Sequence, residues 1–141
     1  DSQSRLMSKA SIISALVLVA GSASAQPAPP MSERAGTALR GLTIMPDSIE
    51  CIGPRGGGLE TVIKRDRDLD AYRILYEMQN EDMYLNILDE ECRHLGKNNS
   101  VTYATKANER EGLCRGDVIY VTGRMSDART RCRLGAFYRL E

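Results

Sequence analysis

Three closely spaced aspartates have the clearest potential for chemistry in this sequence. Asp66, Asp68 and Asp70 alternate with other residues, and paired carboxylates can act as general acid and base when their environments separate their pKa values. Calcium-binding loops share this spacing, but their glycine and closing glutamate are missing here and Arg67 adds an opposing charge. We therefore expect a solvated turn between two strands. A small hydrolase that uses Asp66, Asp68 or Asp117 is the enzymatic alternative.

Three further motifs could form sites, and each also has a structural interpretation. The glycine-rich run 53–58 offers backbone amides to an anion, but it lacks the Lys-Ser/Thr of a phosphate loop, so a surface turn is preferred. His94 has no marked nucleophile near it, which favours an exposed or capping histidine. Asn98-Asn99-Ser100 matches a glycosylation acceptor that matters only in a eukaryotic secretory route. The sequence therefore predicts no catalytic, cofactor-binding or metal-binding residue.

The tripeptide Arg115-Gly116-Asp117 matches the one that integrins bind, but three-residue matches arise by chance. We expect Gly116 to adopt an unusual φ and Asp117 to accept hydrogen bonds from nearby backbone amides. The six tyrosines lie mostly in expected strands. We interpret them as alternating core and surface residues, with a tyrosine-rich binding face as the alternative.

The N-terminus has the pattern of an export signal. Lys9 precedes an apolar run at 12–20, and Ala23-Ser24-Ala25 fits the pockets of signal peptidase. We expect a signal peptide at 1–25, with residues 1–6 upstream of a start at Met7. The apolar run has about nine residues, against roughly 20 in a membrane-spanning helix, so no stable membrane anchor is expected.

A proline-rich segment follows the expected cleavage point. Prolines in 26–30 favour an extended chain, so we interpret 26–45 as a tether. The apolar residues in 39–45 could instead dock on the domain. The remaining chain, 46–141, is expected to form one small β domain.

The composition excludes several classes of function. Nineteen basic residues balance nineteen acidic ones, whereas a general nucleic-acid-binding protein normally carries a basic excess. A single histidine leaves little room for histidine-based metal or triad chemistry. No nucleic acid and no cofactor is therefore expected as a partner.

Four cysteines follow the expected signal peptide: Cys51, Cys92, Cys114 and Cys132. None forms a Cys-x-x-Cys pair, so a zinc site or a redox motif is poorly supported. An even number of cysteines in an exported chain predicts two disulfides. If 117–122 paired with 133–139, Cys114 and Cys132 would lie roughly 26 Å apart, against about 7 Å for a disulfide. Of the two remaining pairings we predict Cys51–Cys132 with Cys92–Cys114.

Hydrophobic alternation predicts short strands. Residues 72–78 and 83–88 alternate on either side of a polar break at 79–82, which is typical of a β-hairpin; a helix over 82–92 is the alternative. Further strands are expected at 59–63, 101–105, 118–122 and 134–140. Gly135 in the last one indicates a bulge or a close backbone approach. The expected fold is all-β with room for a short helix: a small barrel or sandwich of about five to six antiparallel strands, stapled by two disulfides.

Several short motifs occur in a characteristic order. They are Tyr84-Leu85-Asn86-x-Leu88, Cys92-x-x-Leu95, Leu113-Cys114-x-Gly116-Asp117-x-Ile119 and Cys132-x-Leu134-Gly135-x-Phe137. Over about residues 49–140 the chain resembles a family of small exported, disulfide-bonded domains of unknown function from Gram-negative bacteria. The chain departs from that pattern at Arg93, where the family usually has proline, and in the glycine-rich insert at 53–58.

The resemblance implies an exported, disulfide-bonded β domain and brings no activity with it. Gly116, Asp117, Gly135 and Phe137 are then structural residues. Together with the absence of marked chemistry, this predicts a periplasmic or secreted non-enzymatic domain that binds a protein or a cell-envelope component. The alternatives are a small periplasmic hydrolase with paired carboxylates and an inhibitor of a hydrolase.

Overall fold

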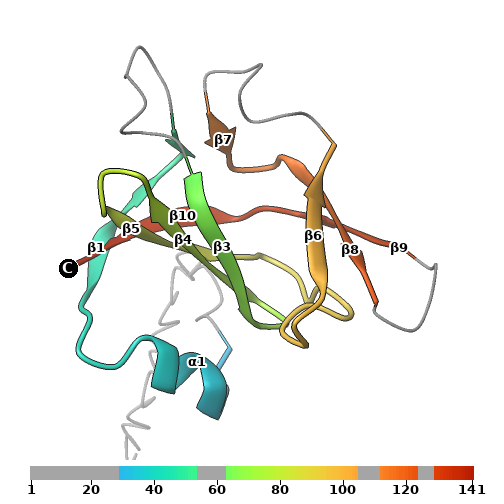
Figure 1. Cartoon of the computed structure of the whole chain (residues 1–141), viewed down its shortest axis with the longest axis horizontal. Helices are drawn as coiled ribbons and strands as arrows, with labels where there is room; N and C mark the ends of the chain where they lie inside the picture. Colours follow the sequence, from blue (N-terminus) through green and yellow to red (C-terminus); the bar gives the residue numbers. More distant parts are fainter. Residues whose placement is uncertain (1–28, 54–62, 105–111, 124–128) are drawn as a thin grey trace, which may run out of the picture.

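The computed structural model describes residues 29–53, 63–104, 112–123 and 129–141 (Figure 1). These residues form antiparallel strands and one short helix, α1 (Glu33–Ala38). The expected signal peptide lies outside the described residues, as does most of the strand expected at 59–63. In chain order the strands are β1 (Ile44–Ile49), β2 (Cys51–Ile52), β3 (Ile63–Asp70), β4 (Arg73–Met78), β5 (Met83–Ile87), β6 (Ser100–Tyr103), β7 (Leu113–Cys114), β8 (Val118–Thr122), β9 (Arg129–Arg133) and β10 (Ala136–Leu140).

Five strands form the larger sheet, in the order β1-β10-β5-β4-β3. The hairpin expected from the alternating pattern is confirmed: β4 and β5 pair antiparallel with Tyr76 opposite Tyr84. The helical alternative for 82–92 does not form. Met83, Leu85 and Ile87 share one face of β5 and contribute to the same apolar cluster, as period-two alternation requires.

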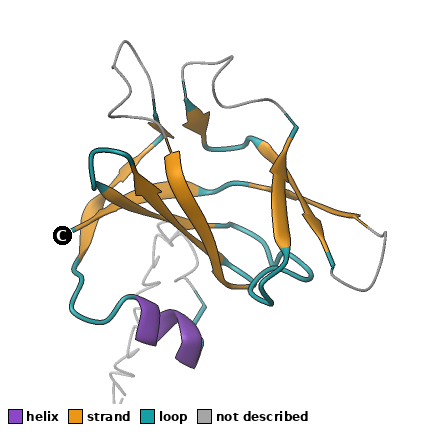
Figure 2. Cartoon of the chain, viewed as in Figure 1, coloured by secondary structure: helices purple, strands orange, loops and turns teal. Residues whose placement is uncertain are grey.

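The remaining strands form two smaller sheets, β6-β8-β9 and β2-β7. Strands β9 and β10 follow each other directly, so that one segment runs from the three-stranded sheet into the five-stranded sheet (Figures 1 and 2). The all-β prediction is confirmed. The described strands form no closed barrel, and the described residues contain ten short strands where about five to six were expected. The strands missed by sequence patterns lack apolar alternation, as β9 with its sequence Arg-Thr-Arg-Cys-Arg shows.

The main core lies between the five-stranded and three-stranded sheets. From β4, Ile74, Tyr76 and Met78 face the same cluster as Ile119 and Val121 of β8. This burial supplies the main favourable free energy of a small fold.

A second core lies on the opposite face of the five-stranded sheet, beneath α1. Ala35 and Leu39 pack there with Leu75 and Leu85. The helix begins at its N-cap Ser32, whose Oγ accepts a hydrogen bond from the Ala35 amide at 3.1 Å. Of the two possibilities for the segment before residue 46, the structure therefore has the docked one from residue 29 onward, and the packed domain begins before residue 46.

The disulfides join Cys51 to Cys114 and Cys92 to Cys132, so the predicted pairing Cys51–Cys132 with Cys92–Cys114 is wrong. The error has a physical cause. Cys51 and Cys114 are directly opposite in the two-residue strands β2 and β7, which are too short to leave a pattern in the sequence. Two disulfides indicate an oxidising, non-cytoplasmic compartment.

None of the helices in the described residues has the length and apolarity to cross a membrane.

Candidate functional site

The three candidate aspartates lie in strand β3, not in the solvated turn that the sequence predicts. β3 is an edge strand that pairs with β4. Its alternating acidic and basic residues are typical of edge strands, where charge discourages pairing with other chains. The pairing with β4 is regular from Asp66 to Asp68 and has a register irregularity between Asp68 and Asp70.

Asp68 is only 7% exposed and holds the 93–99 turn. Its Oδ2 accepts hydrogen bonds from the Gly96 amide at 2.8 Å and from the Asn99 amide at 3.3 Å. A guanidinium nitrogen of Arg34 from α1 lies 3.8 Å from its Oδ1, and Arg34 also donates to the Gly96 carbonyl. Asp68 therefore connects the N-terminal helix to the turn.

Asp70 anchors the segment that precedes α1. Its carboxylate accepts hydrogen bonds from the Tyr72 amide at 2.8 Å, from Arg73 at 3.0 Å and from the Ser32 amide at 3.4 Å. The buried Arg73 also donates to the carbonyl of Pro29. Both Asp68 and Asp70 thus have structural partners.

Asp66 takes part in a polar network between the two sheets. Its Oδ2 accepts a hydrogen bond of 2.6 Å from the Tyr103 hydroxyl of β6, which lies 3.1 Å from the Tyr76 hydroxyl of β4. Burial raises the pKa of both tyrosines well above the usual value, and Asp66 adds to the effect. The neutral Tyr103 hydroxyl donates to the Asp66 carboxylate, and neither phenol acts as a base at physiological pH.

The Arg115-Gly116-Asp117 tripeptide forms a tight turn, as its structural interpretation predicts. Gly116 has a φ of +86°, and the Asp117 Oδ2 accepts a hydrogen bond from the Cys114 amide at 2.8 Å. Arg115 is exposed, and its guanidinium lies 3.5 Å from Asp89 and 3.9 Å from Glu50.

Gly135 lies where two backbones approach closely. A Cβ at this position would be 1.8 Å from the carbonyl oxygen of Ile87. The fully buried Asn86 donates to the Gly135 carbonyl at 2.8 Å and accepts from its amide at 3.0 Å. Phe137 is fully buried, with its ring centroid 5.7 Å from that of Tyr76. The structural role of Asn86 is not evident from the sequence, where it resembles any polar residue of a half-exposed strand.

The other predicted candidates have structural surroundings or lie outside the described residues. His94 is exposed in a turn with a φ of +69°, and its carbonyl accepts a hydrogen bond from the Asn99 side chain at 2.6 Å. The Asn98 side chain of the glycosylation motif accepts a hydrogen bond from Arg34. Only Gly53 of the glycine-rich run is described. Three of the six tyrosines, Tyr76, Tyr84 and Tyr103, belong to the inter-sheet core or pack against it.

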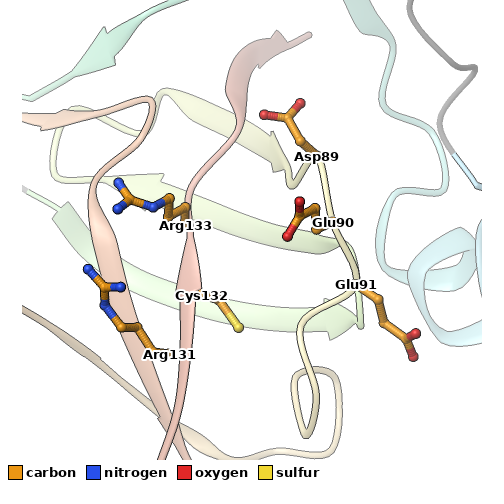
Figure 3. Close-up of a pocket in the computed structure, with 6 residues that line it drawn as sticks. All are labelled: Asp89, Glu90, Glu91, Arg131, Cys132 and Arg133. Carbon is orange, nitrogen blue, oxygen red and sulfur yellow. The ribbon is translucent and has the colours of Figure 1, made fainter.

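A cavity lies beside β9 (Figure 3). It has a volume of about 520 Å³. We call it the β9 groove. Residues of β9 form one side of it and the acidic segment 89–91 forms the other. Its lining residues are Asp89, Glu90, Glu91, Arg131, Cys132 and Arg133.

The two sides of the β9 groove have opposite charge. Figure 3 shows Arg131 and Arg133 directed to one side of β9, whereas Cys132 points toward the acidic segment. The disulfide from Cys132 to Cys92, which directly follows Glu91, fixes the separation of the two sides. In the part of the chain that the structure describes, no ion pair joins the β9 arginines to the acidic segment. Asp89 instead lies 3.5 Å from Arg115, whereas Arg131, Glu90 and Glu91 are exposed to solvent.

Arginines occupy every second position of β9. Arg129, Arg131 and Arg133 are exposed, and the residues between them are half-buried. Arg129 lies over the Tyr120 ring at 6.0 Å from its centroid, and Arg133 donates to the Gly116 carbonyl at 3.3 Å. The sequence signal for this row was the repeated Arg-x-Arg at 129–133. No group of three or more potential metal ligands is clustered within the described ranges.

Comparisons with protein-family models, curated proteins and solved structures find no match to this chain. The resemblance to a family of exported domains therefore stays a prediction from the sequence.

Proposed function

We propose that this protein is an exported, non-enzymatic domain that binds a protein or a cell-envelope component in the periplasm or outside the cell. The β9 groove carries the proposal. It combines a cavity of about 520 Å³ with exposed charged residues of both signs on a scaffold fixed by a disulfide. Cavities of this size are typical of ligand sites, and exposed arginine is enriched at protein interfaces.

The hydrolase alternative receives less support. Catalysis by paired carboxylates needs two acids that act on one bond. Asp66, Asp68 and Asp70 each have separate hydrogen-bond partners that hold different parts of the fold. Asp117 likewise holds a turn.

The proposal is tested by capture of envelope proteins with variants of matched charge. The immobilised domain is incubated with an envelope extract and compared with Arg131→Glu/Arg133→Glu, which reverses one side of the groove. Arg40→Glu/Lys64→Glu makes the same charge change at exposed positions in other elements and serves as the control.

We expect components that are retained by the parent and the control but lost from the groove variant. If all three proteins retain the same components, or none retains any, the proposed function is wrong. Circular dichroism and urea unfolding establish that each variant is folded.

A further inference from the structure

Building on the proposed function, we propose that the β9 groove takes an extended acidic segment of a partner protein, which adds to the three-stranded sheet as a strand beside β9. The class of partner is thus a polypeptide with acidic residues at every second position.

The first support is the position of β9 in its sheet. Among the described strands β9 is hydrogen-bonded to β8 alone, so its other edge has backbone N–H and C=O groups without strand partners. In Figure 3, β9 lies between β8 and the acidic segment 89–91. The groove is therefore on the unpaired side of β9. The Cys92–Cys132 disulfide crosses it with its two Cα atoms 5.8 Å apart, so the added strand would have to lie on the arginine side of that cross-link. An extended peptide can pair with such an edge through its own backbone, and its alternate side chains then supply specificity.

The second support is the spacing of the arginines. Residues that face each other in an antiparallel pair lie on the same side of the sheet. A strand added beside β9 would thus present every second side chain to the row Arg129, Arg131 and Arg133. Acidic side chains fit there, because opposite charges in cross-strand pairs are stabilising. The intervening side chains would lie on the side of Cys132, where Glu90 and Glu91 favour basic or neutral residues.

A second copy of this chain is a poor occupant of the same edge. If two β9 strands paired antiparallel about Arg131, arginine would face arginine at every exposed position, which is destabilising. A shift by one residue would place the half-buried Cys132 on the exposed face. The arginine row therefore excludes self-pairing and selects an acidic partner strand.

The test uses a synthetic peptide as the probe. A fluorescent peptide of about seven residues, a common strand length, carries glutamate at its second, fourth and sixth positions and threonine or lysine elsewhere. Its binding to the full chain with disulfides intact is followed by fluorescence anisotropy. A second peptide has the same side chains but N-methyl groups on alternate residues, which remove the backbone donors needed for strand pairing.

We expect saturable binding of the first peptide and at least about tenfold weaker binding of the N-methylated one. Arg131→Glu should weaken binding about tenfold, because one attractive cross-strand pair becomes repulsive, and Arg131→Glu/Arg133→Glu more. Arg40→Glu/Lys64→Glu should bind as the parent does. The single variant keeps the hydrogen bond from Arg133 to Gly116. Arg131→Glu therefore still tests the arginine row if the double variant has a folding defect.

Three results would overturn the inference. Equal binding of both peptides, or displacement of the first by a sulfated polysaccharide with no effect of N-methylation, would indicate a general anion site. Self-association of Arg131→Thr/Arg133→Thr in the ultracentrifuge, without peptide binding to the parent, would show that the arginines only protect an edge. Loss of envelope capture by the groove variant, without peptide binding, would reject strand addition and leave the proposed function standing.

Discussion

The contact between Asn86 and Gly135 shows how single residues determine this fold. Gly135 has no side chain, so the chain leading into β10 can approach the Ile87 carbonyl closely. The Asn86 side chain then satisfies both the amide and the carbonyl of Gly135 inside the core. Buried backbone groups without partners would otherwise be costly.

We predict that Asn86→Ala lowers the free energy of unfolding by about 2–4 kcal/mol, because two buried backbone groups lose their partner. The measurement is urea unfolding followed by circular dichroism. Asn80→Ala, in the exposed β4–β5 turn, is the control and should cost less than about 1 kcal/mol. Equal stability of the two variants would contradict the role given to Asn86.

Alanine substitutions at three glycines distinguish the cost of steric overlap from the cost of an unfavourable backbone conformation. Gly135→Ala should cost about 3 kcal/mol or more, because its Cβ would overlap the Ile87 backbone. Gly116→Ala meets no atom within 4 Å but has a φ of +86°, so it should cost about 1–2 kcal/mol. Gly123→Ala has neither constraint and should stay within about 0.5 kcal/mol of the parent. Thermal unfolding ranks the three; any other order would contradict these assignments.

At the scale of elements, polar contacts decide how the sheets and the helix are joined. Tyr103 of β6 bonds to Asp66 of β3 and to Tyr76 of β4, which connects the small sheet to the large one. Asp68 and Asp70 at the other end of β3 hold the turn and the segment before α1. The aspartates that suggested catalysis from the sequence therefore act as connections between elements.

We predict that Tyr103→Phe lowers the free energy of unfolding at neutral pH by about 1–3 kcal/mol, because Asp66 loses a donor and the buried Tyr76 hydroxyl loses a partner. Urea unfolding at pH 7 measures this. Tyr138→Phe is the control, since its hydroxyl forms no hydrogen bond to the described residues. Similar losses in the two variants would contradict the network.

The same network predicts a stability that falls at high pH. An unfolded tyrosine ionises near pH 10, whereas burial raises the pKa of Tyr76 and Tyr103 in the folded chain. Their contribution is thus complete below about pH 10 and is lost as the pH rises above it, because the unfolded state releases protons first. Tyr103→Phe should show a shallower decline in urea unfolding between about pH 9 and pH 11.5. An identical pH dependence would be inconsistent with a buried Tyr103.

At the scale of the whole molecule, two disulfides reinforce a small core. They close loops with sequence separations of 63 and 40 residues, and the loop-entropy model gives about 4 kcal/mol for each. Cys51–Cys114 joins the short β2-β7 pair, and Cys92–Cys132 joins the acidic segment to β9. Such cross-links add to the stability of a small domain, which buries a smaller fraction of its surface than a large one.

We predict that Cys51→Ala/Cys114→Ala and Cys92→Ala/Cys132→Ala each lower the free energy of unfolding by about 4 kcal/mol, as measured in urea. Only the second should also weaken binding at the β9 groove, because only that disulfide spans it. Peptide mapping of the non-reduced parent by mass spectrometry is the accompanying check. A peptide that links Cys51 to Cys132 would contradict the structure.

Much of the β architecture could be predicted because it depends on local pattern. The alternation at 72–78 and 83–88 predicts the β4–β5 hairpin, and the β-branched run at 118–122 predicts β8. Strands β2, β7 and β9 could not be found this way, because they are too short or too polar to show a period of two. The β9 groove could not be predicted from the sequence for a related reason. It joins residues about 40 positions apart, and neither segment has a recognisable motif alone.

The sequence by itself determined the all-β class and the expectation of two disulfides, and it predicted structural roles for Gly116, Asp117 and Gly135. These follow from side-chain periodicity, cysteine number and local backbone chemistry, which act over a few residues. The tertiary structure alone decided which cysteines pair, that the aspartates connect elements, that α1 covers the second core, and that an arginine row borders a groove. These features depend on contacts between distant segments, and such contacts are set by packing across the whole core.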